Sequence, residues 1–354
     1  MKSFSLILCL YFSVSVLSVQ AQEQLSTQEP SASVQSSLKN ETVSKEIEQL
    51  RKKAEEGDAD AQYRLSNLYY SGKGVEQSFE KMREWLEKAA GQGHIKAHRN
   101  LGLLYAQGWG VKQDDVKAFE YFKKAAEQNE IAAQRLLGLV YYSGTGVKQD
   151  AVKALEWTTK AAEQGDGEAQ WNLSVFYIQG RGIEPDGIKA LEWLKKAAQQ
   201  GNRDAQRDLG FFYLAAGKEK PDYGIIRPLF EKAAEQGDQT SQRELGKLYS
   251  YGLGVKQDNV VASQWYEKAA AQGDREAQRN LGMLYFLGDG VKQSYVRAAE
   301  LFKKAAEQGD GDAQYFLGEA YDLGAGVKQD REMAQKLFQQ ACENGAEEAC
   351  KRKK

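Results

Sequence analysis

The sequence repeats itself at a fixed spacing of 36 residues over most of its length. Glycines that close a Lys/Ala-rich segment mark this period, and Asn129 occupies the one position of the grid that lacks glycine. Self-similarity at a period of about 20–50 residues is typical of a solenoid, in which each unit packs only on its neighbours. The closing glycines are Gly57, Gly93, Gly165, Gly201, Gly237, Gly273, Gly309 and Gly345.

Within each unit the apolar residues predict two helices. In the third unit, Ala133, Leu137 and Tyr141 form one buried stripe at helical spacing. The Gly-x-Gly-Val segment 144–147 follows, where glycine permits the positive φ that ends a helix, and Asp150 then caps the second helix. We expect eight such units, which open at Ala61, Ala97, Ala133, Ala169, Ala205, Ser241, Ala277 and Ala313.

A small residue follows the buried leucine in the first helix of most units. Glycine inside a helix costs about 0.5–1 kcal/mol relative to alanine, so we expect close approach of the second helix to offset this cost. These residues are Gly102, Gly138, Ser174, Gly210, Gly246, Gly282 and Gly318.

The fifth unit departs from the pattern. Residues 215–222 replace the Gly-x-Gly-Val turn, and Pro228 falls within the expected second helix. Proline lacks a backbone donor and clashes with the preceding turn. The sequence therefore predicts that this helix either starts late, near Pro228, or kinks.

The N-terminal residues predict export. Lys2, the apolar run 4–19 and the small-x-small site 19–21 indicate a signal peptide at 1–21, cleaved after Ala21. The run is shorter than the roughly 20 residues of a spanning helix, which argues against a membrane anchor. We expect a periplasmic or secreted protein without a membrane span after cleavage.

The segment 22–43 is polar and Ser/Gln/Glu-rich, so it is predicted to be a flexible tether. A lone helix is expected to start at Ser44 and to cover the open face of the first unit. This lone helix and the eight helix pairs that follow it should give the solenoid at 44–354 a total of 17 helices.

Candidate chemical motifs are weak. Ser36 and Lys39 match a Ser-x-x-Lys motif, but the chain has no Ser-Asp-Asn or Lys-Thr-Gly segment to complete such a site. His94 and His98 have a chelating i, i+4 spacing, but a metal site needs three or four ligands, so exposed surface histidines are expected. The formal net charge of −2 gives no support to nucleic-acid binding. We expect no catalytic residue, metal or cofactor.

The repeated motifs Leu-Gly-x-x-Tyr, Gly-x-Gly-Val-x-x-Asp and Lys-Ala-Ala-x-x-Gly resemble those of the Sel1-like repeat family, a relative of the tetratricopeptide repeats. The resemblance covers residues 44–354. It implies an all-α, right-handed α/α superhelical solenoid of eight 36-residue helix-turn-helix repeats with an N-terminal capping helix. It also implies a non-catalytic scaffold that binds a protein segment on the inner face. The alternative is a hydrolase of β-lactams or cell-wall peptide, as in the cysteine-rich branch of the family.

The segment at Cys342 and Cys350 resembles that cysteine-rich secreted branch, in which the same eight-residue offset links neighbouring helices. The two cysteines lie near the end of one expected helix and the start of the next. The resemblance and the predicted export indicate a disulfide, with two free thiols as the alternative.

The position two residues after each opening residue projects away from the Leu/Tyr stripe, on the side that faces inward in related solenoids. Arginines and aromatic residues dominate binding hot spots, so this row predicts a surface for an acidic polypeptide with apolar side chains. The row contains Tyr63, Arg99, Arg135, Trp171, Arg207, Arg243, Arg279 and Tyr315.

A plainer alternative applies to two of the arginines. Arg207 and Arg279 follow an acidic residue by three positions and are expected to form surface ion pairs with it. Arg99, Arg135 and Arg243 have no acidic residue at that offset, which favours the binding hypothesis for them. Trp109 and Trp171 have no tryptophan equivalents in other units and are further candidates for partner contact, whereas four periodic tryptophans are expected to pack. These four are Trp85, Trp157, Trp193 and Trp265.

Overall fold

The computed structural model describes residues 36–217 and 220–352, and this part of the chain is helical and contains no strand. The expected capping helix is α3 (Ser36–Glu55). The eight expected pairs follow it, and a short helix, α20 (Glu347–Lys351), comes last. The pairs are α4 (Ala59–Ser71) with α5 (Phe79–Gly91), α6 (Ile95–Gln107) with α7 (Asp115–Glu127), α8 (Ile131–Ser143) with α9 (Ala151–Glu163), α10 (Gly167–Gln179) with α11 (Gly187–Gln199), α12 (Arg203–Ala216) with α13 (Tyr223–Glu235), α14 (Gln239–Tyr251) with α15 (Asn259–Ala271), α16 (Arg275–Leu287) with α17 (Tyr295–Glu307), and α18 (Gly311–Leu323) with α19 (Arg331–Glu343).

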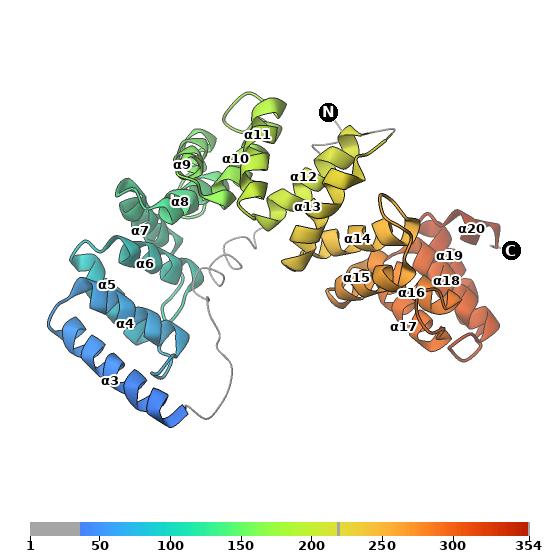
Figure 1. Cartoon of the computed structure of the whole chain (residues 1–354), viewed down its shortest axis with the longest axis horizontal. Coiled ribbons are helices and arrows are strands. Elements are labelled where there is room, and N and C mark those ends of the chain that lie inside the picture. The colour runs from blue at the N-terminus through green and yellow to red at the C-terminus, as the bar shows by residue number, and fades with distance from the viewer. Residues whose placement is uncertain (1–35, 218–219, 353–354) are drawn as a thin grey trace. The chain divides into compact units, whose positions relative to one another are not determined.

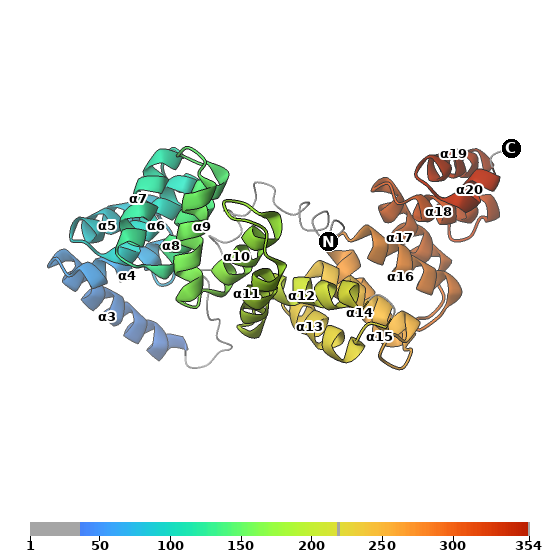
Figure 2. The ribbon, with the colours of Figure 1, turned by 90° about the horizontal axis from the view of Figure 1, so that it is seen from above.

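The described helices divide into two compact units, with the boundary between Lys196 and Ala197. Within each unit the two helices of a repeat lie side by side, and the second helix packs on the first helix of the next repeat, as α4–α6 and α14–α17 show in Figures 1 and 2. First helices of successive repeats also approach one another, as α14 and α16 do. The first helices of a unit therefore form one face of its stack.

Helix α3 begins at Ser36, eight residues before the start that the apolar pattern indicated. The sequence has no glycine or proline between Pro30 and Gly57, so nothing in its backbone chemistry ends the helix at Ser44. The predicted signal peptide at 1–21 and most of the predicted tether lie outside the described residues. No described helix is long and apolar enough to cross a membrane.

The predicted turn between the two helices of a regular repeat is confirmed. In the third repeat, the C-cap Gly144 has a φ of 75° and donates its N–H to the carbonyl of Val140. The side chain of Asp150 then accepts from the N–H of Lys153 at the start of α9. These caps satisfy backbone groups that a helix leaves unpaired at its ends.

Close helix approach explains the glycines inside the first helices. A Cβ atom on Gly102 would lie 2.5 Å from the ring of Phe122, and one on Gly282 would lie 2.7 Å from that of Phe302. Contacts this short would force either the ring or the helix to move. The expected compensation for these glycines is therefore confirmed.

The fifth repeat excludes one of the two alternatives predicted for its second helix. Helix α13 starts at Tyr223, where Asp222 caps it by accepting from the N–H of Gly224, so the expected late start near Pro228 is wrong. Pro228 lies inside the helix. Ile226 and Phe230 are fully buried on the core side, and their burial offsets the backbone bond that Pro228 removes.

A ladder of buried glutamines, which the sequence analysis did not identify, connects successive helices. In the sixth repeat, Nε2 of Gln242 donates to the carbonyl of Ala234 in the preceding helix at 3.1 Å. Its Oε1 accepts from Nε2 of Gln272, which caps the following helix, at 2.8 Å. Each of these glutamines thus joins its own helix to the helix before it and to the helix after it. The equivalents of Gln242 with both bonds are Gln62, Gln134, Gln206, Gln278 and Gln314.

Candidate functional site

The arginines of the first helices form ion pairs between repeats. Each donates to the acidic residue that caps the first helix of the following repeat, 31 residues later. Arg99, Arg135 and Arg243 have no acidic residue three positions before them, but each has an acidic partner in the next repeat, which weakens the argument that favoured them as partner contacts. The pairs are Arg99–Glu130, Arg135–Asp166, Arg207–Asp238, Arg243–Asp274 and Arg279–Asp310.

Burial differs along this row. Arg135 is only 1% exposed and contacts Glu168 as well as Asp166. Burial lowers the pKa of Arg207, but the carboxylates of Asp208, Asp204 and Asp238 outweigh this effect and hold its pKa above the ordinary value. Arg207 consequently stays charged, and its charge is balanced inside the protein. The side chains of Arg99, Arg207, Arg243 and Arg279 are 14–23% exposed beside their partners.

Where a repeat lacks the arginine, the residue that caps the first helix of the following repeat is not acidic. Tyr63 stacks on His94, which stands 31 residues later, with ring centroids 4.6 Å apart. Trp171 has Asn202 at the same offset. Arginine and acid therefore occur together or are replaced together along this chain, a sequence signal that identifies the pairs once the offset of 31 is known.

The two histidines have structural roles. His94 caps α6 by accepting from the N–H of Ala97 through Nδ1, and its Nε2 lies 3.2 Å from Asp60. His98 takes the place of the ladder glutamine and is buried, so the expectation of two exposed histidines is wrong. Burial lowers the pKa of His98, although its bond to the His94 carbonyl opposes the shift. The described residues hold no group of His, Cys, Asp and Glu side chains suited to a metal ion.

The tryptophans occupy different environments. Trp109 packs on the rings of Tyr70 and Phe79, at 5.2 and 5.9 Å, and so joins the first two repeats. Trp171 lies half-buried on α10, next to Asn172. In each of the four periodic tryptophans on the second helices, the ring faces the ammonium group of the lysine three residues later, at 3.9–4.1 Å.

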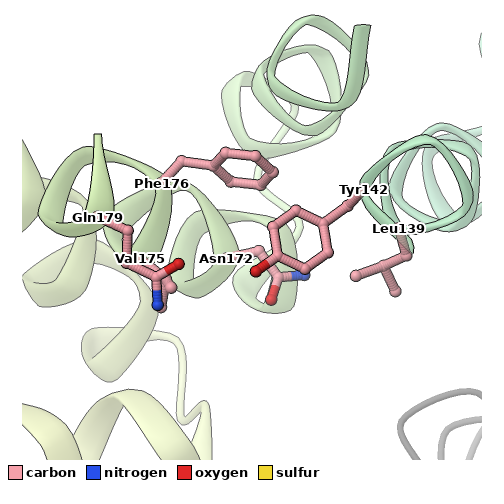
Figure 3. Close-up of a pocket in the computed structure, with 6 residues that line it drawn as sticks. All are labelled: Leu139, Tyr142, Asn172, Val175, Phe176 and Gln179. Carbon is pink, nitrogen blue, oxygen red and sulfur yellow. The ribbon is translucent and has the colours of Figure 1, made fainter. Parts of the chain in front are cut away.

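A small pocket opens between α8 and α10 on the first-helix face of the N-terminal unit. Figure 3 shows Tyr142 and Phe176 approaching each other across it, and their ring centroids lie 5.4 Å apart. Two polar atoms in this pocket, Nδ2 of Asn172 and Oε1 of Gln179, have no hydrogen-bond partner. The lining residues are Leu139, Tyr142, Asn172, Val175, Phe176 and Gln179.

In the C-terminal unit, exposed apolar residues occupy the repeat position at which Gln179 stands in the fourth repeat. Tyr251, Leu287 and Leu323 end three successive first helices and are 69%, 60% and 69% exposed. The first four repeats have Ser71, Gln107, Ser143 and Gln179 at this position. Gln179 lines the pocket described above, so the position belongs to the first-helix face.

The predicted disulfide is present. Cys342 at the end of α19 and Cys350 in α20 are bonded, with an S–S distance of 2.03 Å. Ala341, Ala346 and Ala349 form a buried cluster beside it. The bond therefore holds the last helix against the final repeat.

Comparison with known proteins agrees with this architecture. The model of the Sel1 repeat family matches eight times, at residues 59–94, 95–130, 131–166, 167–202, 203–238, 240–274, 275–310 and 311–345. Comparison with curated proteins finds no significant match.

Two solved structures are similar over most of the chain. One is a protective antigen of uropathogenic Escherichia coli with an SLR fold, at 35% identity and a TM-score of 0.77, which covers 87% of this chain. This chain spans 66% of that antigen's length. The other is a Sel1 repeat protein from Oxalobacter formigenes, at 30% identity and a TM-score of 0.57, with 94% of this chain and 98% of that one covered. The chain belongs to the Sel1 repeat family, whose members are generally protein-interaction scaffolds.

Proposed function

We propose that this protein is a non-catalytic scaffold, exported to the periplasm or secreted, that binds a polypeptide partner on the face formed by its first helices. The observation that carries the proposal is the exposed apolar row Tyr251, Leu287 and Leu323. Large apolar side chains at one exposed position of three successive repeats form a patch that water solvates poorly. A partner with apolar side chains removes that patch from water.

The partly exposed arginines support an acidic partner. Arg99, Arg207, Arg243 and Arg279 each lie beside a carboxylate of the next repeat. A guanidinium group has five N–H donors, so a partner carboxylate at the edge of the pair can accept from a second N–H. We propose that these four arginines and Trp171 contact the partner beside the apolar row. We assign Arg135 and Trp109 to the packing between repeats.

Export is supported by the disulfide Cys342–Cys350, since such bonds persist in oxidising compartments. The predicted signal peptide at 1–21 agrees with it. The formal net charge of −2 supports a protein partner in preference to a nucleic acid.

Selection from a displayed random-peptide library tests the proposal, with the affinity of a selected peptide then measured by calorimetry. We expect Leu287→Ser with Leu323→Ser, which restores the serine found in the first and third repeats, to weaken binding at least about tenfold. The matched control is Val152→Ser with Ile188→Ser, because these residues are equally exposed but lie on second helices. Equal losses in the two double variants, with both folded, would refute binding on the first-helix face.

A further inference from the structure

An open pocket of about 530 Å³ lies between the first two repeats, on the side of their second helices. Its volume falls within the range of small-molecule sites. Arg83 on α5 forms one wall, and the end of α6, the turn after it and the start of α7 form the others. Three cationic groups and one carboxylate give the lining a formal charge of +2. These charged residues are Arg83, Lys112, Lys117 and Asp114.

The carboxylate of Asp114 is held by the helix that it caps. Its Oδ1 accepts from the backbone N–H of Lys117 at 3.0 Å, at the start of α7. Its Oδ2 lies 3.8 Å from the ammonium group of the same lysine, which is too long for a hydrogen bond. That ammonium group lies over the ring of Tyr105, 5.1 Å from its centroid, and the lysine side chain is 58% exposed. Lys117 therefore presents its charge at the pocket wall.

The guanidinium group of Arg83 is only weakly neutralised by the protein. Its Nε is buried and has no acceptor among the described residues, and the carboxylate of Glu87 lies 3.8 Å from that atom. Arg227 stands at the same repeat position four repeats later, where Glu231 accepts from it at 2.8 Å and raises its pKa. The side chain of Arg83 is 30% exposed where it lines the pocket, so its charge lies within reach of a ligand.

In the next repeat, a phenylalanine stands at the position of this arginine. Phe119 is buried and packs edge-on against Tyr141, with ring centroids 5.5 Å apart. Lys153 lies over the ring of Tyr141 at 5.3 Å, as Lys117 lies over Tyr105. The lysine and the tyrosine therefore recur in the next repeat, whereas the arginine that completes the pocket does not.

We infer that this pocket binds the phosphate monoester of a small hydroxylated molecule, such as a sugar phosphate. A phosphate monoester carries a charge of about −1.5 to −2 at pH 7 and has three strong acceptor oxygens, which match the charge of the lining and its three cationic groups. A carboxylate brings one charge and two oxygens. Nε2 of Gln113 donates to Asp115 at 3.0 Å, which leaves its Oε1 to accept from a hydroxyl group of the ligand. This site goes beyond the proposed function, because it lies on the second-helix side and takes a small molecule.

Calorimetric titration of the full-length mature chain with glucose 6-phosphate tests the inference. We expect saturable binding that weakens as salt is added, because salt screens the charges. Glucuronic acid carries a carboxylate at the same carbon of the same ring, and inorganic phosphate has no carrier. We expect each to bind at least about fivefold more weakly, because each makes fewer hydrogen bonds in the pocket. Vesicles of phosphatidylcholine with phosphatidic acid should capture no protein, because that lipid has no hydroxyl groups beside its phosphate.

Three variants complete the test. Arg83→Met should weaken the binding of glucose 6-phosphate at least about fivefold. Arg227→Met is the matched control and should leave the affinity unchanged, because that arginine stands at the same repeat position and is paired with Glu231. Glu87→Gln removes the carboxylate nearest to Nε of Arg83 and should strengthen binding. Because Glu87 is exposed on α5, this third variant carries the test if the melting curve shows that Arg83→Met is unfolded.

Absence of saturable binding, or equal affinity for glucose 6-phosphate and glucuronic acid, would overturn the inference. Equal affinity for inorganic phosphate would reduce the pocket to an unspecific anion site and overturn it as well. So would undiminished affinity in Arg83→Met, no gain in Glu87→Gln, or capture by the phosphatidic acid vesicles. Peptide binding that depends on Leu287 and Leu323 is measured without this ligand, so the scaffold proposal and this inference can fail separately.

Discussion

Asp274 offers a clean way to measure what one inter-repeat ion pair contributes. Its carboxylate caps α16 by accepting from the N–H of Ala277 at 2.8 Å, and it also accepts from Arg243 at 2.8 Å. Asparagine caps helices as well as aspartate does, so Asp274→Asn keeps the cap and removes the charge. Arg243→Met removes the guanidinium group and keeps much of the side-chain volume. The double variant completes a thermodynamic cycle.

The exposed fractions of the two side chains set the coupling free energy that we expect. The side chains of Arg243 and Asp274 are 20% and 8% exposed, so the pair lies between the solvated and the fully buried limits. Exposed pairs contribute about 0.2–1 kcal/mol, and breaking a buried pair costs about 3–5 kcal/mol. Arg243 also keeps Glu244 and Glu276 as neighbours when Asp274 is neutral. We therefore expect a coupling free energy of about 1–2 kcal/mol.

The assay is urea unfolding of the four proteins, analysed with separate free energies for each repeat and each interface. The coupling should appear in the interface between the sixth and seventh repeats. Arg227 and Glu231 form a matched control pair within one helix, at 2.8 Å and with more exposed side chains. A coupling at Arg243–Asp274 no larger than that of the control pair would refute the view that these arginines hold successive repeats together.

Further predictions concern the core, the ladder, the C-terminal helix and catalysis. Gly282→Ala should lower the free energy of unfolding by about 1–3 kcal/mol, because its Cβ would lie 2.7 Å from Phe302. A Cβ on Gly91 would have no atom within 4 Å, so Gly91→Ala should raise the free energy of unfolding by about 0.5–1 kcal/mol. Urea unfolding measures both changes. His98 has a lowered pKa in the folded state, so its neutral form contributes stability above pH 6.5 that is lost as the pH falls towards the folded pKa. His98→Gln should accordingly raise the melting temperature, and more at pH 5 than at pH 7.5. Cys350→Ser should remove about 2.5 kcal/mol from the final repeat, with fast hydrogen exchange confined to α20. Purified protein should not turn over a chromogenic β-lactam.

The sequence predicted the fold because its signals are local and repeated. Gly144 and Asp150 mark the end of one helix and the start of the next by their own backbone and side-chain chemistry, and the structure confirms them. The partner of Arg135 was not predicted, because it lies 31 residues away and depends on how two repeats pack. Of the two alternatives predicted for α13, the late start is wrong because tertiary burial of Phe230 outweighs the local penalty of Pro228.

The sequence predicted less of the candidate site than of the fold. An exposed leucine such as Leu287 and a buried one such as Leu281 look alike in a pattern of apolar residues, and only packing separates them. Comparison of one repeat position across all units distinguishes them. Leu287 and Leu323 stand where the first and third repeats have Ser71 and Ser143, so this position does not need an apolar residue for packing. The unpaired Nδ2 of Asn172 has a sequence signal only once the bond of Asn100 to Asn67 is known, because Leu139 stands at the position of Asn67.

Hydroxyl-radical footprinting of the full chain with a library-selected peptide tests the central claim most directly, because it reports which side chains the partner covers. Binding on the first-helix face predicts protection of Tyr251, Leu287 and Leu323, with Val152 and Ile188 on the second helices as reactive as in the free protein. Protection of Val152 and Ile188 with unchanged reactivity of Tyr251, Leu287 and Leu323 would contradict it.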